Sequence, residues 1–168
     1  MKTNVYLAGG TVGGWQHEVM DNFGSESPVH DKVQFYNPAD FMVGSIEYPD
    51  EALYSPMNRL KIDECDIMFA NLQAGNPTPI NTALEIGYAL GQGKTVIFCN
   101  GWTDNAFENG DLRCLKTEQD GIRASWFKTR YLAQLKNWVT FYEEDFGIAI
   151  LLLQKILEYE HDQVVREW

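Results

Sequence analysis

Short runs of apolar residues recur along the chain, separated by segments with helical spacing. The runs are rich in β-branched and aromatic residues and lack strict polar alternation, which is typical of strands buried on both faces of a parallel sheet. They predict five strands, at residues 4–8, 33–36, 66–70, 94–99 and 138–142.

Apolar residues at helical spacing predict helices between the strands. The expected helices are residues 15–23, 57–64, 79–91, 126–135 and 146–159. Polar residues and proline-containing pairs predict irregular structure at residues 39–56 and 100–125. Strands that alternate with helices imply a doubly wound α/β domain with a mainly parallel sheet. Without an internal repeat or a linker, residues 1–168 form one domain.

Two of these helices have a predicted inward face. Thr78 can cap the helix at residues 79–91, Pro79 suits its first position, and Gly91 and Gly93 end it. We expect this helix to lie close to the sheet through a face of small and apolar residues, namely Ile80, Ala83, Leu84, Gly87 and Gly91. In the helix at residues 57–64 we expect Leu60 and Met57 to pack inward.

Glu85 is the carboxylate in an otherwise almost uncharged helix. The helical spacing turns it away from the expected small-residue face, toward Asn81, Thr82 and Tyr88. A solvated surface carboxylate is the plain interpretation. The helix begins at the edge of the sheet where doubly wound folds bind ligands, however, which favours a site residue.

The turn at residues 9–14 is rich in glycine and follows the first predicted strand. Its spacing departs from the dinucleotide-binding fingerprint, and no acidic residue ends the strand at residues 33–36. A close approach to a sugar and a purely structural turn both remain open. The segment at residues 91–95 is similar to the tail of a P-loop, but it joins a helix to a strand, so we interpret it as a helix stop.

Charge and composition exclude some partners. The 168 residues are 45% hydrophobic and 13% aromatic, which suits a folded domain with a sizeable core. The formal net charge of −11 argues against a nucleic-acid backbone or an anionic membrane as the partner. The longest apolar run, at residues 148–153, is too short to span a bilayer.

Cysteine and histidine usage predicts neither a disulfide framework nor a metal site. The chain has an odd number of cysteines, namely Cys65, Cys99 and Cys114, which points to a reducing compartment. No signal peptide precedes the first strand, so we expect a cytoplasmic location. The histidines have no ligand spacing with the cysteines, and we assign them surface or capping roles. We therefore expect no metal and no cofactor.

The segment from Glu85 to Lys94, EIGYALGQGK, resembles the signature of the nucleoside 2-deoxyribosyltransferase family. Residues 5–10, VYLAGG, are similar to the first strand and turn of that family, and residues 65–70, CDIMFA, to its third strand. The resemblance covers roughly residues 4–100. It implies a flavodoxin-like sandwich, enzymatic transfer of a 2-deoxyribosyl group between nucleobases, and a homo-oligomer that binds small nucleosides and bases.

The resemblance also implies roles for single residues. Glu85 would be the nucleophile that attacks the anomeric carbon, Tyr6 would hold its carboxylate, and Gly9 and Gly10 would line the sugar pocket. We add to the substrate-binding prediction the polar residues at or near the ligand edge, namely Asn58, Asn71, Thr78 and Asn81.

Three departures from the family pattern bear on the reaction. Asn58 and Pro79 stand where the family usually has acidic or hydroxyl side chains, and Asn58 cannot supply a proton as a carboxylic acid can. Asp63 is a possible substitute. Val12 stands where related nucleotide N-glycosidases carry an arginine, which favours a nucleoside over a nucleotide. Hydrolysis with water as acceptor and a nucleotide-sensing module without turnover remain alternatives.

Overall fold

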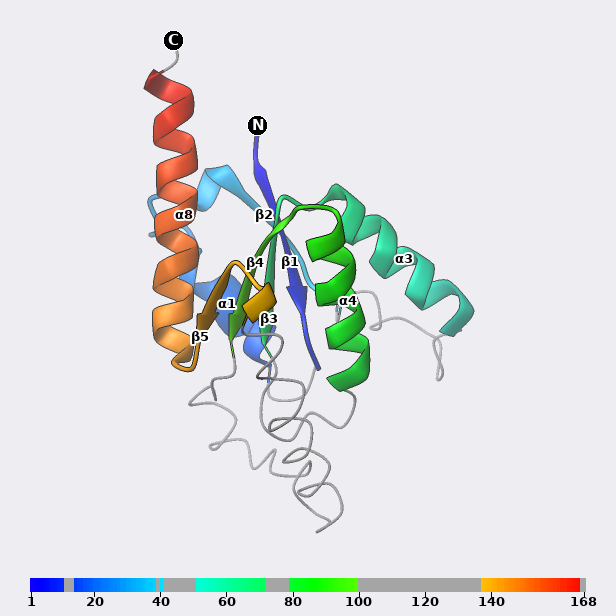
Figure 1. The fold of residues 1–168 in the computed structure, drawn as a ribbon. Coiled ribbons are helices and arrows are strands. Elements are labelled where there is room, and N and C mark those ends of the chain that lie inside the picture. Colours follow the sequence, from blue (N-terminus) through cyan, green and yellow to red (C-terminus); the bar gives the residue numbers. More distant parts are fainter. Residues whose placement is uncertain (11–13, 39, 41–50, 72–78, 100–136, 167–168) are drawn as a thin grey trace.

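The computed structural model describes residues 1–10, 14–38, 40, 51–71, 79–99 and 137–166. Five parallel strands form one sheet in the order β2-β1-β3-β4-β5 (Figure 1). Their bounds are β1 Thr3–Ala8, β2 Val33–Tyr36, β3 Ile67–Asn71, β4 Thr95–Cys99 and β5 Phe141–Glu143. This is the strand order of flavodoxin-like sheets, so the predicted fold class is confirmed.

Helices cover both faces of the sheet. Helices α1 (Trp15–Asn22) and α8 (Phe146–Arg166) lie on one face, and α3 (Glu51–Glu64) and α4 (Pro79–Gly91) on the other (Figure 1). A short 3-10 helix, η1 (His30–Lys32), leads into β2. Among the described residues, no helix combines the length and the apolar composition that crossing a bilayer requires.

Successive residues of β1 divide between two apolar cores because side chains alternate along a strand. Val5 and Leu7 belong to the core under α1 and α8, whose centre includes the fully buried Trp15. Tyr6 and Ala8 belong to the core under α3 and α4. The alternation therefore directs the Tyr6 side chain toward the helix that carries the predicted nucleophile.

The first four strands lie within one residue of their predicted bounds, whereas β5 is displaced toward the C-terminus. Trp138, predicted to begin this strand, is 74% exposed in a helical turn before it. The strand itself consists of Phe141–Glu143, which pair with Ile97–Cys99. An edge strand has one neighbour, so its position follows from pairing with β4 rather than from its own apolar run.

Two helices are longer than predicted. Helix α8 continues past its apolar pattern to Arg166, and α3 begins at Glu51, so residues 51–56 are helical rather than irregular. Proline-containing pairs predict irregular structure over this segment, but Pro56 lies inside α3 and is accommodated there without an N–H donor. The helix expected at residues 126–135 lies outside the described residues.

The inward face of α3 differs from the prediction. Asn58 and Ile62 are buried at positions i and i+4 of α3, and Cys65, directly after the helix, is buried at position i+7, so the three define one inward stripe. Leu60 is 53% exposed and Met57 is 42% exposed, so neither makes the expected core contact. The buried stripe contains a polar amide, which is why an apolar pattern alone selects the wrong face.

The inward face of α4 also differs. Thr82, Ile86 and Ala89 are buried, whereas Leu84 is 67% exposed and a methyl group added at Gly87 would meet nothing within 4 Å. Positions 84 and 86 lie on nearly opposite sides of a helix, so burying Ile86 turns Leu84 outward. Gly87 therefore does not bring α4 close to the sheet, and that prediction is wrong.

The predicted end of α4 is confirmed in its geometry. Gly91 is the last helical residue, and Gly93 adopts a left-handed φ of 73°. The N–H of Gly93 donates to the carbonyl of Leu90 and that of Lys94 to the carbonyl of Ala89, both at 3.0 Å, which is a Schellman motif. The segment that is similar to a P-loop is thus a helix stop.

Candidate active site

A carboxylate on α4 meets side chains from two other elements on the α3/α4 face of the sheet. Glu85 Oε1 accepts a hydrogen bond from the Tyr6 hydroxyl at 3.0 Å and another from Asn58 Nδ2 at 3.3 Å. Tyr6 comes from β1 and Asn58 from α3. In the described part of the chain, both bonds end on Oε1 and none on Oε2. Among the described residues, one carboxylate oxygen is therefore held by two donors and the other by none.

Local packing explains why these three side chains converge. Tyr6 is fully buried, and a buried hydroxyl needs a hydrogen-bond partner. Asn58 is 8% exposed on the inward stripe of α3. Glu85 is half-buried and directly precedes Ile86, which is fully buried against the sheet. Turning Ile86 inward thus brings Glu85 to the border of the core, beside both donors.

Burial sets the protonation of this carboxylate. Desolvation raises the pKa of Glu85 to about 7, while the hydrogen bonds from Tyr6 and Asn58 act in the opposite direction because they stabilise the charged form. Both protonation states are therefore populated near neutral pH. Such a group can attack as a nucleophile when it is ionised, or exchange a proton with a bound molecule.

The glycine turn after β1 is packed too tightly to accept a side chain. Gly9 has a φ of 152°, and a Cβ atom there would clash with the backbone oxygen of Asn71 and lie 2.8 Å from the Trp15 ring. The Gly10 carbonyl accepts hydrogen bonds from Trp15 Nε1 at 2.8 Å and Gln16 Nε2 at 3.2 Å. These contacts explain on structural grounds why residue 9 is a glycine, whether or not the turn also contacts a sugar.

Asn71 ends β3 at the carboxyl edge of the sheet. It is 1% exposed, and among the described residues neither its Oδ1 nor its Nδ2 has a hydrogen-bond partner. Alternation along β3 places its side chain with Phe69 on the α1/α8 face, opposite Ala70. Asn71 and Glu85 therefore lie on different faces of the sheet.

The predicted site residues thus fall into separate groups. Tyr6, Asn58 and Glu85 are in direct contact, whereas Gly9, Gly10 and Asn71 gather at the carboxyl edge of β1 and β3. Thr78 lies outside the described residues. Asn81 lies in the first turn of α4, and its side chain is likewise outside the description.

Trp15 and Gln16, which brace the Gly10 carbonyl, were not singled out as site residues by the sequence analysis. Their position at the start of the helix that follows a glycine turn was the available signal. Asp63 makes no contact with Glu85: it is exposed, and hydrogen bonds from Gln92 and Tyr88 lower its pKa. It therefore does not serve as the acid beside Glu85.

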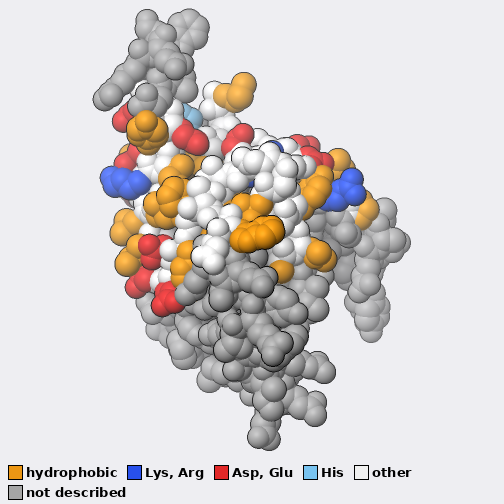
Figure 2. Space-filling model, in the orientation of Figure 1, with side chains coloured by type: hydrophobic (Ala, Val, Ile, Leu, Met, Phe, Trp, Pro, Cys, Tyr) orange, Lys and Arg blue, Asp and Glu red, His pale blue; other side chains and the backbone are white. Residues whose placement is uncertain are grey.

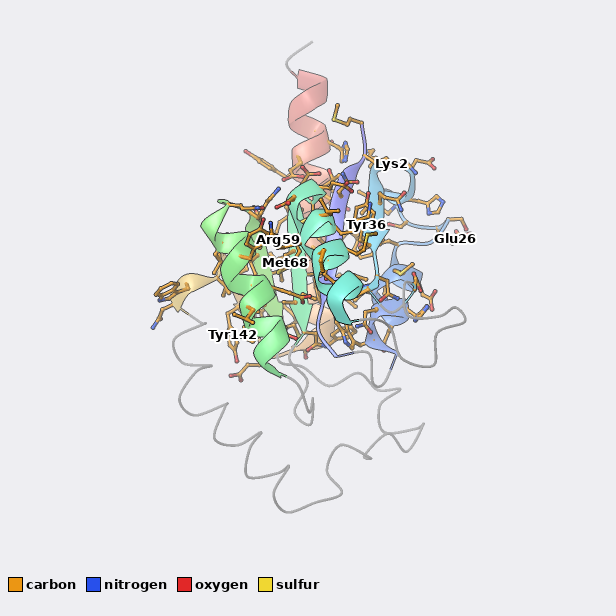
Figure 3. All side chains as sticks on the ribbon, turned by 90° about the vertical axis from the view of Figure 1, so that its right-hand side faces the viewer. Lys2, Glu26, Tyr36, Arg59, Met68 and Tyr142 are labelled. Carbon is orange, nitrogen blue, oxygen red and sulfur yellow. The ribbon has the colours of Figure 1, made fainter. Side chains whose placement is uncertain are left out.

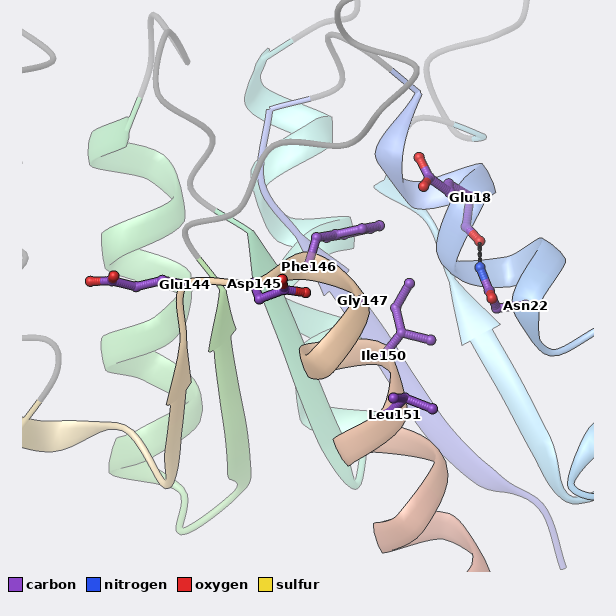
Figure 4. A pocket seen from close by; sticks show the side chains of 8 residues that line it. All are labelled: Glu18, Asn22, Glu144, Asp145, Phe146, Gly147, Ile150 and Leu151. Carbon is purple, nitrogen blue, oxygen red and sulfur yellow. Dashed lines mark hydrogen bonds between the residues drawn. The ribbon is translucent and has the colours of Figure 1, made fainter.

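A shallow pocket lies on the opposite face of the sheet, between α1 and the start of α8 (Figure 4). Asp145 there caps α8, since its Oδ1 accepts a hydrogen bond from the N–H of Ile148 at 3.0 Å. The lining includes two further carboxylates, Glu18 and Glu144, yet in the described ranges no group of three or more His, Cys, Asp or Glu residues is placed to hold a metal. This pocket is separate from the Glu85 cluster.

Residues 2–101 match the family described as "Nucleoside 2-deoxyribosyltransferase like". This chain belongs to the nucleoside 2-deoxyribosyltransferase-like family. The matching residues are more than half of the chain and include Tyr6, Asn58 and Glu85, and they confirm the resemblance on which the expected function depends. A search of curated proteins found no match.

Two solved structures have folds similar to the fold of this chain. The 2-deoxyribosyltransferase of Bacillus psychrosaccharolyticus aligns with a TM-score of 0.55 and 14% identity, over 88% of this chain and 90% of that chain. A conserved protein from Enterococcus faecalis aligns with a TM-score of 0.61 and 14% identity, over 95% of this chain and 99% of that chain. Identity this low shows a shared fold alone.

Proposed function

We propose that this protein transfers a 2-deoxyribosyl or ribosyl group between nucleobases, with Glu85 as the nucleophile. The observation that carries the proposal is the half-buried Glu85 carboxylate, held through one oxygen by Tyr6 and Asn58 inside the segment that matches the family. A carboxylate that is held through one oxygen and attacks through its other oxygen suits covalent catalysis at an anomeric carbon.

In the proposed reaction, Oε2 of ionised Glu85 attacks C1′ of the bound nucleoside. The C1′–O bond of a glycosyl ester forms as the C1′–N bond breaks, and the bonding pair leaves with the base, which takes up a proton from solvent water. A ring nitrogen of a second base then attacks C1′, which breaks the ester and regenerates the carboxylate, and that nitrogen gives up its proton to solvent. Tyr6 and Asn58 donate to Oε1 throughout and stabilise the charge that returns to Glu85 in the second step.

The neighbours of Glu85 set the class of leaving base. In the part of the chain that the structure describes, Tyr6 and Asn58 donate hydrogen bonds to the carboxylate, and neither is an acid at neutral pH. Asp63 is hydrogen-bonded elsewhere and its pKa is lowered. We therefore propose that the first step is fastest with bases that leave readily without a proton from a neighbouring carboxylic acid.

Hydrolysis is a second candidate, and the pKa of Glu85 favours it. A carboxylate whose pKa is about 7 matches the operating pH of a general base, and it could activate a water molecule instead of attacking the sugar. The two reactions differ in stereochemistry, since direct attack by water inverts the anomeric carbon and passage through an ester retains it.

Substrate contacts beyond the Glu85 cluster are also part of the proposal. We propose that Gly9, Gly10 and Asn71 border the bound sugar at the carboxyl edge, and that Thr78 and Asn81 add polar contacts at the start of α4. Among the described residues the Asn71 amide has no hydrogen-bond partner, and this supports its assignment to the edge, because a buried polar group without a partner is costly unless something binds it.

We further propose that the protein is a homo-oligomer. Large apolar side chains are exposed on α4 and α8, with Leu84 at 67% and Leu151 at 59%, and Figure 2 shows hydrophobic side chains at the surface over these helices. Self-association would cover part of this surface. Light scattering coupled to gel filtration tests it, and a monomer at micromolar concentration contradicts it.

Incubation with a panel of nucleosides, with and without an acceptor base, tests the activity. A new nucleoside that appears only with the acceptor indicates transfer, and free sugar in both reactions indicates hydrolysis. The Glu85→Gln variant should lose the activity, whereas Glu64→Gln, which removes an exposed carboxylate on α3, should keep it. No product from any nucleoside would overturn both candidates and leave a binding module.

A further inference from the structure

Helices α3 and α4 lie side by side on the same face of the sheet and are joined at two levels (Figures 1 and 3). The first level is the contact between Asn58 and Glu85. The second lies further along both helices, where the Asp63 carboxylate on α3 accepts hydrogen bonds from side chains of α4 and the turn after it. The Tyr88 hydroxyl donates to Asp63 Oδ1 at 2.7 Å, and the Gln92 amide donates to the same oxygen.

Tyr88 also makes a second contact with α3. The guanidinium of Arg59 lies 5.7 Å from the centre of the Tyr88 ring, within cation–π range, and Figure 3 shows Arg59 between the two helices. Lys94 Nζ donates to the backbone oxygens of Asp63 at 2.9 Å and of Cys65 at 2.6 Å, where α3 ends. The ends of α3 and α4 are therefore tied together by side chains of both helices.

The spacing links the two levels mechanically. Glu85 and Tyr88 are three residues apart on α4, and Asn58 and Asp63 are five residues apart on α3, with Asn58 buried and Asp63 exposed at the rim of the same helix pair. A sliding or rotation of one helix against the other changes both contacts together. The bond from Asn58 to Glu85 is 3.3 Å long, so a displacement of a few tenths of an ångström removes it from hydrogen-bond range.

We infer that Asp63 and Tyr88 are positioning residues, whose hydrogen bond keeps Asn58 in contact with the Glu85 carboxylate. Their importance for turnover rests on the proposed function, whereas their effect on the environment of Glu85 does not. An exposed polar contact contributes little to stability by itself, so a purely structural role predicts small, uniform effects on every property.

The test is the pKa of Glu85, measured by carbon NMR of labelled protein in Tyr88→Phe and Asp63→Ala, which remove the donor and the acceptor of this hydrogen bond. Tyr88→Phe removes the hydroxyl and keeps the ring under Arg59. If Asn58 withdraws, Glu85 loses a donor to its charged form, and we expect its pKa to rise by roughly half a pH unit in both variants. A functioning enzyme should show the same rise in the acid limb of its rate profile, with kcat reduced more than KM.

The matched control is Glu64→Gln. Glu64 is adjacent to Asp63 and pairs with Lys61 inside α3, without reaching α4. Loss of a negative charge alone makes a nearby carboxylate easier to ionise, so Glu64→Gln should leave the pKa of Glu85 unchanged or slightly lower. The Asp63→Ala variant also removes a negative charge but loses the acceptor for Tyr88, and it is expected to raise the pKa of Glu85, which separates the effect of positioning from the effect of charge.

A variant cycle with Asn58→Ala completes the test. Once the Asn58 amide is absent, Tyr88→Phe should produce no further rise in the pKa of Glu85, because its effect acts through that amide. An unchanged or lowered pKa in Tyr88→Phe, or a full rise in the Asn58→Ala background, would overturn the inference. The expected pKa changes without any nucleoside chemistry would instead overturn the proposed function alone.

Discussion

A half-buried Glu85 with a pKa of about 7 makes the stability of the fold depend on pH. Its ordinary value is 4.5, so between pH 4.5 and 7 the native state holds a proton that the unfolded chain has released. The contribution of this group to the free energy of unfolding therefore falls as the pH rises through that range. Above pH 7 the native state carries the full cost of a desolvated charge.

Glu85→Gln should consequently stabilise the protein while removing its activity. The neutral amide has no desolvated charge, so at pH 8 we expect the free energy of unfolding to exceed that of the wild type by up to about 3 kcal/mol. At pH 4 the difference should vanish. Urea denaturation at both pH values measures it, with Glu64→Gln as the control, and a gain that is independent of pH would contradict the assigned environment.

Tyr6 should act on the same carboxylate through its hydroxyl. Tyr6→Phe removes the donor at 3.0 Å, so we expect the pKa of Glu85 to rise and the acid limb of kcat/KM to move above pH 7. Activity at pH 6 should then fall more than activity at pH 9. Tyr159→Phe, at a 65% exposed tyrosine on α8, serves as the control. Equal losses at both pH values would indicate that Tyr6 has a different role.

Part of this cluster was accessible from the sequence. Glu85 and Tyr6 were predicted through the family resemblance, and a lone carboxylate in an uncharged helix pointed to the same residue. Asn58 was predicted to bind substrate, and that stays a prediction; the structure adds that its amide donates to Glu85, 27 residues away along the chain. That contact, like the one between Tyr88 and Asp63, depends on how α3 and α4 pack, which sequence spacing does not specify.

The elements themselves show where sequence patterns succeed. Strands β1 to β4 were predicted within one residue because each is a buried apolar run. The inward faces of α3 and α4 were missed because their buried stripes include Asn58 and Thr82, while Leu60 and Leu84 remain exposed. Hydrophobicity alone therefore placed these helices in the fold without giving their rotation about their own axes.

Two glycines test the revised rotation of α4 and the packing of the turn after β1. Gly87 is exposed inside the helix with open space around it, so Gly87→Ala should stabilise the protein by about 0.5–1 kcal/mol. Gly9→Ala should instead destabilise the protein by about 1–3 kcal/mol, because at this positive φ the methyl group would clash with the backbone oxygen of Asn71. Thermal unfolding measures both changes. A destabilising Gly87→Ala would indicate that Gly87 lies on a face of α4 packed closely against the sheet, as the sequence analysis predicted.

At the scale of the whole molecule, charge shapes which substrates are accepted. The chain carries a formal charge of −11, and Val12 in the first turn supplies no cation. A dianionic 5′-phosphate should therefore bind less well than a free 5′-hydroxyl, and added salt should narrow the difference by screening. Specificity constants for a nucleoside and its 5′-monophosphate measure this. A clear preference for the monophosphate would require a basic clamp elsewhere in the chain.

The fold brings β1, α3 and α4 together around one carboxylate, and the central claim is that this carboxylate bonds covalently to the sugar. A 2′-fluorinated arabino-nucleoside with a good leaving base should react slowly and accumulate the ester, since fluorine destabilises the oxocarbenium-like state that breaks it down. Mass spectrometry of the intact protein should show one sugar adduct, mapped by digestion to the peptide containing Glu85. An active preparation that forms no adduct and releases sugar with inverted configuration would contradict the covalent path and leave Glu85 as a general base.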